Sequence, residues 1–206
     1  MNLANKLTLV RICLVPFFIL FMELGGFFYT ILALVIFCVA SITDFFDGHI
    51  ARKNKTVTPL GIFLDPLADK LLISSAFICF VCISYLKISA WMVIAIISRE
   101  FLITGLRSIA AYKSVIIPAD KSGKFKTTLQ MVVIITTLII VIINEAFSKY
   151  IEFQIDFLKL YNNGTYSYMV GIIEKIPYWF TFFAAIFTIF SGANYIFKYK
   201  NLLDEK

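Results

Sequence analysis

Long apolar runs separated by short polar stretches dominate the pattern along this chain. A helix needs about 20 such residues to cross the hydrocarbon core of a bilayer. Backbone polar groups in lipid must be paired, so these runs are expected to be helices. The alternating pattern of a membrane β-barrel is absent from the sequence. The pattern predicts six transmembrane helices after a short N-terminal interfacial segment, near residues 10–22, 30–52, 60–86, 90–112, 126–143 and 178–197.

Composition strengthens this prediction. Of the 206 residues, 60% are apolar and only 16% are charged, against about 25% charged in an ordinary soluble domain. Such a chain is neither a soluble globular domain nor a disordered one. We expect an all-α polytopic membrane protein with a single domain over residues 1–206. Its net charge of +6 is expected to reflect topology and contact with membrane lipids, and no nucleic acid is expected as a partner.

The termini and the connections between the predicted helices alternate between the two sides of the membrane, and positive charge is divided unevenly between these two sets. One set, with its edges, carries twelve basic residues: Lys6, Arg11, Arg52, Lys53, Lys55, Lys113, Lys121, Lys124, Lys126, Lys198, Lys200 and Lys206. The opposite set carries four: Lys87, Lys149, Lys159 and Lys175. This difference predicts that both termini lie in the cytoplasm. On the other side, residues 144–177 form the longest connection, and Phe153 and Phe157 within it indicate a surface helix. The Ile-, Phe- and Lys-rich composition is typical of an AT-rich bacterial genome, so the predicted location is the cell membrane of a bacterium.

Four aspartates stand where the second and third predicted helices adjoin. Asp44 and Asp47 are three residues apart and Asp65 and Asp69 are four apart, so each pair shares one helix face. The short linker makes the two helices antiparallel neighbours, and the pairs are expected to meet near the cytoplasmic boundary. Charged residues inside membrane helices are costly and usually functional.

Carboxylates gathered this closely repel one another unless cations neutralise them. Carboxylate oxygens favour hard ions such as Mg²⁺ or Mn²⁺, and two such ions form a clamp suited to phosphoryl transfer. The alternatives are a proton or cation pathway and ion pairs with Arg52 and Lys70. Neighbouring residues could also contact a ligand, although a purely structural role would explain several of them as well. Gly48, Ala51 and Gly61 permit close approach or helix packing, Arg52 could pair with a phosphate, and Thr58 reads as a helix N-cap.

These residues resemble a known signature. The pattern Asp44-x2-Asp47-Gly48-x2-Ala51-Arg52-x8-Gly61-x3-Asp65-x3-Asp69 is similar to that of the CDP-alcohol phosphatidyltransferases. Three further patterns resemble the phosphatidylglycerophosphate synthase branch of that family. They are Asn5-x-Leu7-Thr8-x2-Arg11-x4-Pro16, Ser98-Arg99-Glu100 with Arg107, and Gly123-Lys124-x-Lys126-Thr127-x2-Gln130. Residues 144–177 depart from the branch, because they are longer and more polar than expected.

The resemblance implies transfer of a phosphatidyl group from CDP-diacylglycerol to an alcohol, with release of CMP, by a homodimer. It implies that two metal ions are held by Asp44, Asp47, Asp65 and Asp69, and that Asp69 is also the general base toward the acceptor hydroxyl. It further implies contacts with the CDP-diacylglycerol donor from Asn5, Thr8, Gly48, Ala51, Arg52, Thr58 and Gly61.

Basic residues near the cytoplasmic ends of the fourth and fifth helices indicate an anionic acceptor, which matches sn-glycerol 3-phosphate. The candidates for binding its phosphate are Arg99, Arg107, Lys121, Lys124 and Lys126. The three lysines could equally be ordinary cytoplasmic charge. Arg99 and Arg107 are eight residues apart, which puts them on one helix face. Glu100 is expected to pair with a neighbouring cation or a helix end.

Other functions stay open at this point. The acceptor could be inositol phosphate, serine or phosphatidylglycerol, with the same chemistry. A cation transporter would use aspartates spread through the membrane depth, whereas these cluster at one end of two helices. A catalytically silent scaffold would have no need of all four carboxylates.

Overall fold

The computed structural model describes the backbone of residues 3–54, 59–112, 121–158 and 175–199. Side chains are described for residues 6–43, 64, 67–110, 125–147 and 175–199. Over the described backbone the secondary structure is all helical, as the sequence predicted, and contains no strand. The elements are α1 (Leu3–Leu24), α2 (Phe27–Asn54), α3 (Pro59–Cys82), the 3₁₀ helix η1 (Ser84–Leu86), α4 (Ala90–Tyr112), α5 (Lys121–Leu158) and α7 (Lys175–Tyr199).

Three helical stretches are long and apolar enough to cross a bilayer, among the residues that the structure describes. They are Lys6–Leu24, Phe125–Phe147 and Lys175–Tyr199, and Phe27–Thr43 is a shorter apolar helix. The helix α4 has 23 residues but carries Arg99, Glu100 and Arg107. Long apolar helices of this kind are those of a membrane protein, whereas the count of six spans stays a prediction.

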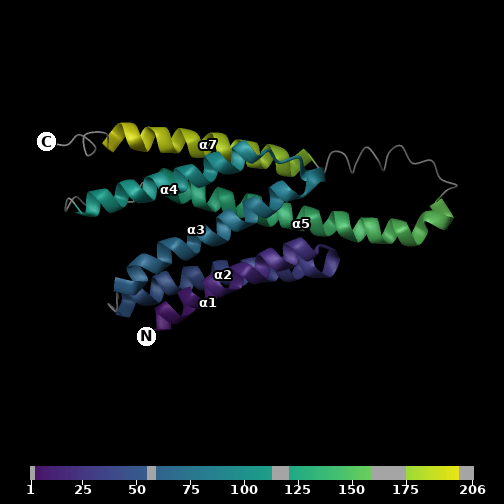
Figure 1. Cartoon of the computed structure of the whole chain (residues 1–206), viewed down its shortest axis with the longest axis horizontal. Helices are drawn as coiled ribbons and strands as arrows, with labels where there is room; N and C mark the ends of the chain where they lie inside the picture. The colour runs from purple at the N-terminus through teal and green to yellow at the C-terminus, as the bar shows by residue number, and fades with distance from the viewer. Residues whose placement is uncertain (1–2, 55–58, 113–120, 159–174, 200–206) are drawn as a thin grey trace.

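Two groups of helices make up the bundle, and α3 lies between them (Figure 1). The first helix, α1, packs along α2 and α3, while α7 packs along α4 and α5. The core between them is formed by fully buried aromatic and aliphatic side chains, including Phe18, Phe37, Phe77, Ile96 and Leu138. The rings of Phe18 and Phe37 join α1 to α2, with centroids 6.2 Å apart.

One end of the bundle gathers the helix ends that the sequence assigned to the cytoplasm. The first residues of α1, α3 and α5 lie at this end, together with the last residues of α2, α4 and α7 (Figure 1, left). The helices α2 and α3 are antiparallel neighbours there, as their short linker predicted. The grouping agrees with the predicted topology, while the side of the membrane stays a prediction.

Three helices differ from the sequence prediction. The third was predicted to run to about residue 86, but α3 ends at Cys82 and the separate 3₁₀ helix η1 follows it. The first helix runs without a break from Leu3 to Leu24, so it is longer than the span predicted at 10–22. The interfacial position of its first residues stays a prediction. The fifth helix was predicted to end near residue 143, but α5 has 38 residues and runs to Leu158. At about 1.5 Å per residue, it is far longer than a bilayer core of about 30 Å. Residues 144–158 contain no Gly or Pro, so nothing in their sequence ends the helix.

A carboxylate from α5 holds the turn between α1 and α2 at the opposite end of the bundle. Gly25 and Gly26 have φ of 60° and 87°, a left-handed conformation that glycine adopts without steric cost. The Gly26 N–H donates to Glu145 Oε1 at 3.1 Å, and the Thr30 hydroxyl donates to Glu145 Oε2 at 2.8 Å. No acidic residue lies in the first turn of α2, so Glu145 supplies the negative charge that stabilises a helix N-terminus.

Replacing Glu145 with alanine is therefore expected to destabilise the bundle. The Gly26 N–H and the buried Thr30 hydroxyl would both lose their carboxylate partner, at a cost of about 1–3 kcal/mol. Thermal unfolding in detergent should show a lower midpoint than for the unmodified chain. Glu23→Ala, which removes an exposed acid at the end of α1, is the matched control and should leave the midpoint unchanged. Equal midpoints for both variants would contradict this role of Glu145.

Candidate active site

The aspartate signature lies on adjoining ends of two neighbouring helices. Asp44 and Asp47 belong to the last part of α2, and Asp65 and Asp69 to the first half of α3. The third helix begins at Pro59, as predicted from the sequence. Of these four aspartates, Asp69 is the one whose side chain is described; it is half-buried and takes part in interactions.

The residues predicted to contact the CDP-diacylglycerol donor are not all described in equal detail. Gly48, Ala51 and Arg52 lie on α2 and Gly61 on α3, as parts of the helix backbone, while Thr58 lies outside the described residues. Asn5 belongs to the first turn of α1. Thr8 is almost fully buried on α1, three residues from the equally buried Arg11, and both take part in interactions. This face of α1 is therefore turned into the bundle.

Four basic side chains from three helices form a cluster beside Asp69. This basic cluster consists of Lys70 on α3, Arg99 and Arg107 on α4, and Lys126 on α5. Lys126 interacts electrostatically with Arg99, Asp69 and Lys70, and Lys70 interacts with Asp69, Arg107 and Arg99. The cluster thus brings Asp69 close to three of the predicted phosphate-binding cations, Arg99, Arg107 and Lys126.

Glu100 partly neutralises the basic cluster. Its carboxylate pairs with Lys126, and Arg99 Nη1 lies 3.7 Å from Glu100 Oε1. This pairing with neighbouring cations confirms one of the two partners predicted for Glu100. Lys70 donates to the Thr104 hydroxyl, which in turn donates to the Glu100 carbonyl at 2.8 Å. Four positive charges face two negative ones, Glu100 and Asp69, in the described part of the site, which favours an anionic ligand.

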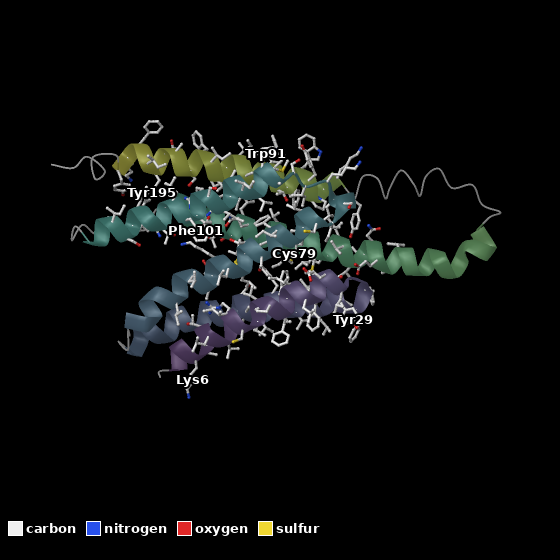
Figure 2. All side chains as sticks on the ribbon, viewed as in Figure 1. Lys6, Tyr29, Cys79, Trp91, Phe101 and Tyr195 are labelled. Carbon is white, nitrogen blue, oxygen red and sulfur yellow. The ribbon has the colours of Figure 1, made fainter. Side chains whose placement is uncertain are left out.

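The two arginines of α4 both reach α7. Arg99 Nη2 donates to Ser191 Oγ at 3.2 Å, and Arg107 Nε donates to the Tyr195 hydroxyl at 3.3 Å. The Arg107 guanidinium also lies 5.8 Å from the centre of the Tyr195 ring, a cation–π contact. Figure 2 shows Tyr195 where α7 runs beside α4, near the left-hand end of the bundle. The prediction that Arg99 and Arg107 share a face is therefore confirmed, although their acceptor role stays a prediction.

Sequence comparison identifies the family to which this arrangement belongs. A sequence model of the CDP-alcohol phosphatidyltransferases matches residues 1–190. The chain belongs to this family. It is therefore an enzyme of the phosphotransferase class, and the resemblance seen in the aspartate signature is confirmed.

Three of the curated relatives share the name CDP-diacylglycerol–glycerol-3-phosphate 3-phosphatidyltransferase. The protein from Bacillus subtilis (strain 168) is 43% identical over 145 residues, which are 65% of this chain and 74% of the relative. The protein from Rickettsia typhi (strain Wilmington) is 35% identical over 197 residues, 94% of each chain. The protein from Escherichia coli (strain K12) is 40% identical over 136 residues, 64% of this chain and 73% of the relative.

Enzymes of the CDP-alcohol phosphatidyltransferase family generally depend on a divalent metal. The donor set of this chain fits such an ion, because four carboxylates on two adjoining helix ends offer the oxygen ligands that Mg²⁺ and Mn²⁺ prefer. Among the described side chains, no three His, Cys, Asp or Glu residues come together. Asp44, Asp47 and Asp65 are outside that set, so the metal site stays a prediction.

Several residues of the site were not assigned to it from the sequence. Ser191 and Tyr195 were not singled out, and Lys70 was considered only as an ion-pair partner of the aspartates. Ser191 and Tyr195 are four residues apart in a mostly apolar helix, and this spacing on one face was the available signal. Of the predicted cations, Lys126 joins the cluster, whereas Lys121 and Lys124 are described only as backbone in the first turn of α5.

Proposed function

We propose that this family member transfers the phosphatidyl group of CDP-diacylglycerol to sn-glycerol 3-phosphate, forming phosphatidylglycerophosphate and CMP. The observation that carries the proposal is the position of Asp69. It belongs to the aspartate signature of α3, and it also interacts electrostatically with Lys70 and Lys126 of the basic cluster. A donor diphosphate near the aspartates and an acceptor phosphate near the cations would therefore lie side by side. The names of the relatives agree with these two substrates.

In the proposed reaction, Asp69 is the general base. A hydroxyl oxygen of glycerol 3-phosphate forms a bond to the phosphorus of the phosphatidyl group, and the bond from this phosphorus to the CMP oxygen breaks. The proton of the attacking hydroxyl passes to the Asp69 carboxylate, which increases the nucleophilicity of the oxygen. The basic cluster holds the acceptor phosphate, so that the hydroxyl is delivered to the base in a fixed orientation.

The other predicted residues bind the donor in this proposal. Asp44, Asp47, Asp65 and Asp69 would hold two divalent ions, Mg²⁺ or Mn²⁺. When bound, these ions supply charge neutralisation for the diphosphate and for departing CMP. Arg52 pairs with a donor phosphate, and the small residues Gly48, Ala51 and Gly61 leave room for the nucleotide. Asn5, Thr8 and Thr58 complete the donor contacts.

The proposal includes a membrane arrangement. A single domain with six spans would place both termini and the site in the cytoplasm, and the shared end of α1, α2, α3, α4, α5 and α7 supports this arrangement (Figure 1). The homodimer is carried over from the family resemblance, and cross-linking in native membranes is its test.

CMP release by the purified protein in detergent tests the reaction. The assay contains CDP-diacylglycerol and Mg²⁺, with or without glycerol 3-phosphate. We expect release only when the acceptor is present. Release with inositol phosphate, serine or phosphatidylglycerol, but not with glycerol 3-phosphate, would keep the chemistry and overturn the acceptor. No release with any alcohol, from protein shown to be folded, would favour a scaffold or a transporter.

Removal of divalent metal is expected to abolish turnover in the same assay. With EDTA in excess, the carboxylates of α2 and α3 lose the ions that neutralise the donor diphosphate, so CMP release should fall to background. Added Mg²⁺ or Mn²⁺ should restore it. Binding of glycerol 3-phosphate depends on the basic cluster instead, and calorimetry should show that it survives chelation. Full CMP release in EDTA would contradict the metal assignment.

A further inference from the structure

Gly192 of α7 lies against the side chain of Arg99. A Cβ atom placed on Gly192 would be 2.7 Å from Arg99 Cγ, 3.6 Å from its Nε and 3.8 Å from its Cδ. Real Cβ atoms do not approach a carbon as closely as 2.7 Å. Because Cγ is near the base of the arginine side chain, relief of this contact would require Arg99 to leave its present χ1 rotamer.

We infer that Gly192 is a positioning residue for the acceptor phosphate, through Arg99. This inference rests on the proposed function, in which Arg99 binds that phosphate. Without a side chain at residue 192, Arg99 can lie across the surface of α7. Its guanidinium is then held between Ser191 of α7 and Glu100 of its own helix.

The Nε donor of Arg99 points to a ligand in the same place. Its Nε is buried and has no hydrogen-bond partner among the described residues. A buried donor without a partner is unfavourable, and in native proteins it usually serves a ligand, ion or water. The space kept open by Gly192 adjoins this Nε atom. A methyl group at residue 192 would both displace the arginine and occupy space beside its free donor.

Gly192→Ala is therefore expected to weaken acceptor binding selectively. The KM for glycerol 3-phosphate should rise by about 10-fold or more, the factor expected when a hydrogen bond to a charged group is lost, while the KM for CDP-diacylglycerol stays unchanged. Gly105→Ala is the matched control, since a Cβ at this α4 glycine meets no atom within 4 Å. Its KM values should equal those of the unmodified enzyme, because alanine favours a helix and contacts nothing there.

A double-mutant cycle separates positioning from a general packing defect. Arg99→Ala alone should raise the KM for glycerol 3-phosphate, and Gly192→Ala should add little to it, because the side chain it displaces is gone. Ser191→Ala adds no volume and removes one hydrogen-bond partner of Arg99, so it should raise the same KM by a smaller factor. This variant tests the inference even if Gly192→Ala folds poorly. Additive effects in the cycle, together with an unchanged KM in Ser191→Ala, would overturn the inference. If the unmodified protein does not use glycerol 3-phosphate, the proposed function itself fails.

Discussion

Asp69→Asn is expected to remove turnover while leaving CDP-diacylglycerol bound. Asparagine keeps the shape of the side chain and one oxygen, but it cannot accept the proton of the acceptor hydroxyl. Loss of a general base typically lowers the rate by about 10²–10⁴-fold, so CMP release should fall by at least two orders of magnitude. Donor binding, measured with labelled CDP-diacylglycerol, should change much less, because three aspartates of the signature remain on α2 and α3.

Glu23→Gln provides the matched control for this substitution. It makes the same change from carboxylate to amide on an exposed residue at the end of α1, far along the bundle from the aspartate signature (Figure 1). CMP release by this variant should equal that of the unmodified enzyme. If Asp69→Asn retains full activity with normal donor binding, Asp69 is not the base, and another carboxylate of the signature must be considered.

Arg107→Ala is expected to raise the KM for glycerol 3-phosphate about 10- to 100-fold. A hydrogen bond to a charged group contributes about 1.5–3 kcal/mol, and its loss corresponds to a change of this size. Arginine has five N–H donors, and the one on Nε is taken by the Tyr195 hydroxyl. The ring of Tyr195 lies beneath the guanidinium as well, so the arginine is oriented before an anion arrives. The KM for CDP-diacylglycerol should be unaffected, which initial-rate measurements with each substrate varied in turn will show.

Two further variants make the test of Arg107 more specific. Tyr195→Phe keeps the ring and removes the hydroxyl acceptor, so it should raise the same KM by a smaller factor. Lys198→Ala is the control. It removes an exposed cation that lies over the ring of Tyr199, one helical turn after Tyr195, and it should change neither KM. Equal increases in both KM values for Arg107→Ala would show that the arginine supports the fold rather than the acceptor.

Periodicity and fixed spacing explain which parts of this enzyme could be predicted from its sequence. Apolar runs of bilayer length set the positions of the helices, and α4 begins and ends at the predicted residues, 90 and 112. The period of the α-helix also put Arg99 and Arg107 on one face, where the structure has them. Recognition of the family depended on eight residues with fixed gaps, a pattern that can be found without knowing how the helices pack.

Contacts between distant helices could not be predicted in the same way. Nothing in the sequence near Ser191 and Tyr195 indicates that α7 lies beside α4, because a mostly apolar helix can pack in many orientations. Glu145 was predicted only as part of the connection at residues 144–177, although its carboxylate holds the start of α2. Residues 144–158 were predicted to belong to a connection that contains a surface helix, whereas their helix is the continuation of α5.

The parallel arrangement of α4 and α7 determines when the proposed acceptor site can form during synthesis. Parallel neighbours cannot be joined by a short turn, and here the chain first returns along the bundle as α5 (Figure 1). The ribosome therefore completes the whole aspartate signature and both arginines of α4 well before Ser191 and Tyr195 are made. A nascent chain that lacks α7 would hold every carboxylate of the signature but would leave both arginines without their α7 partners. The two arginines of the proposed acceptor site thus gain their α7 partners only as the final described helix docks.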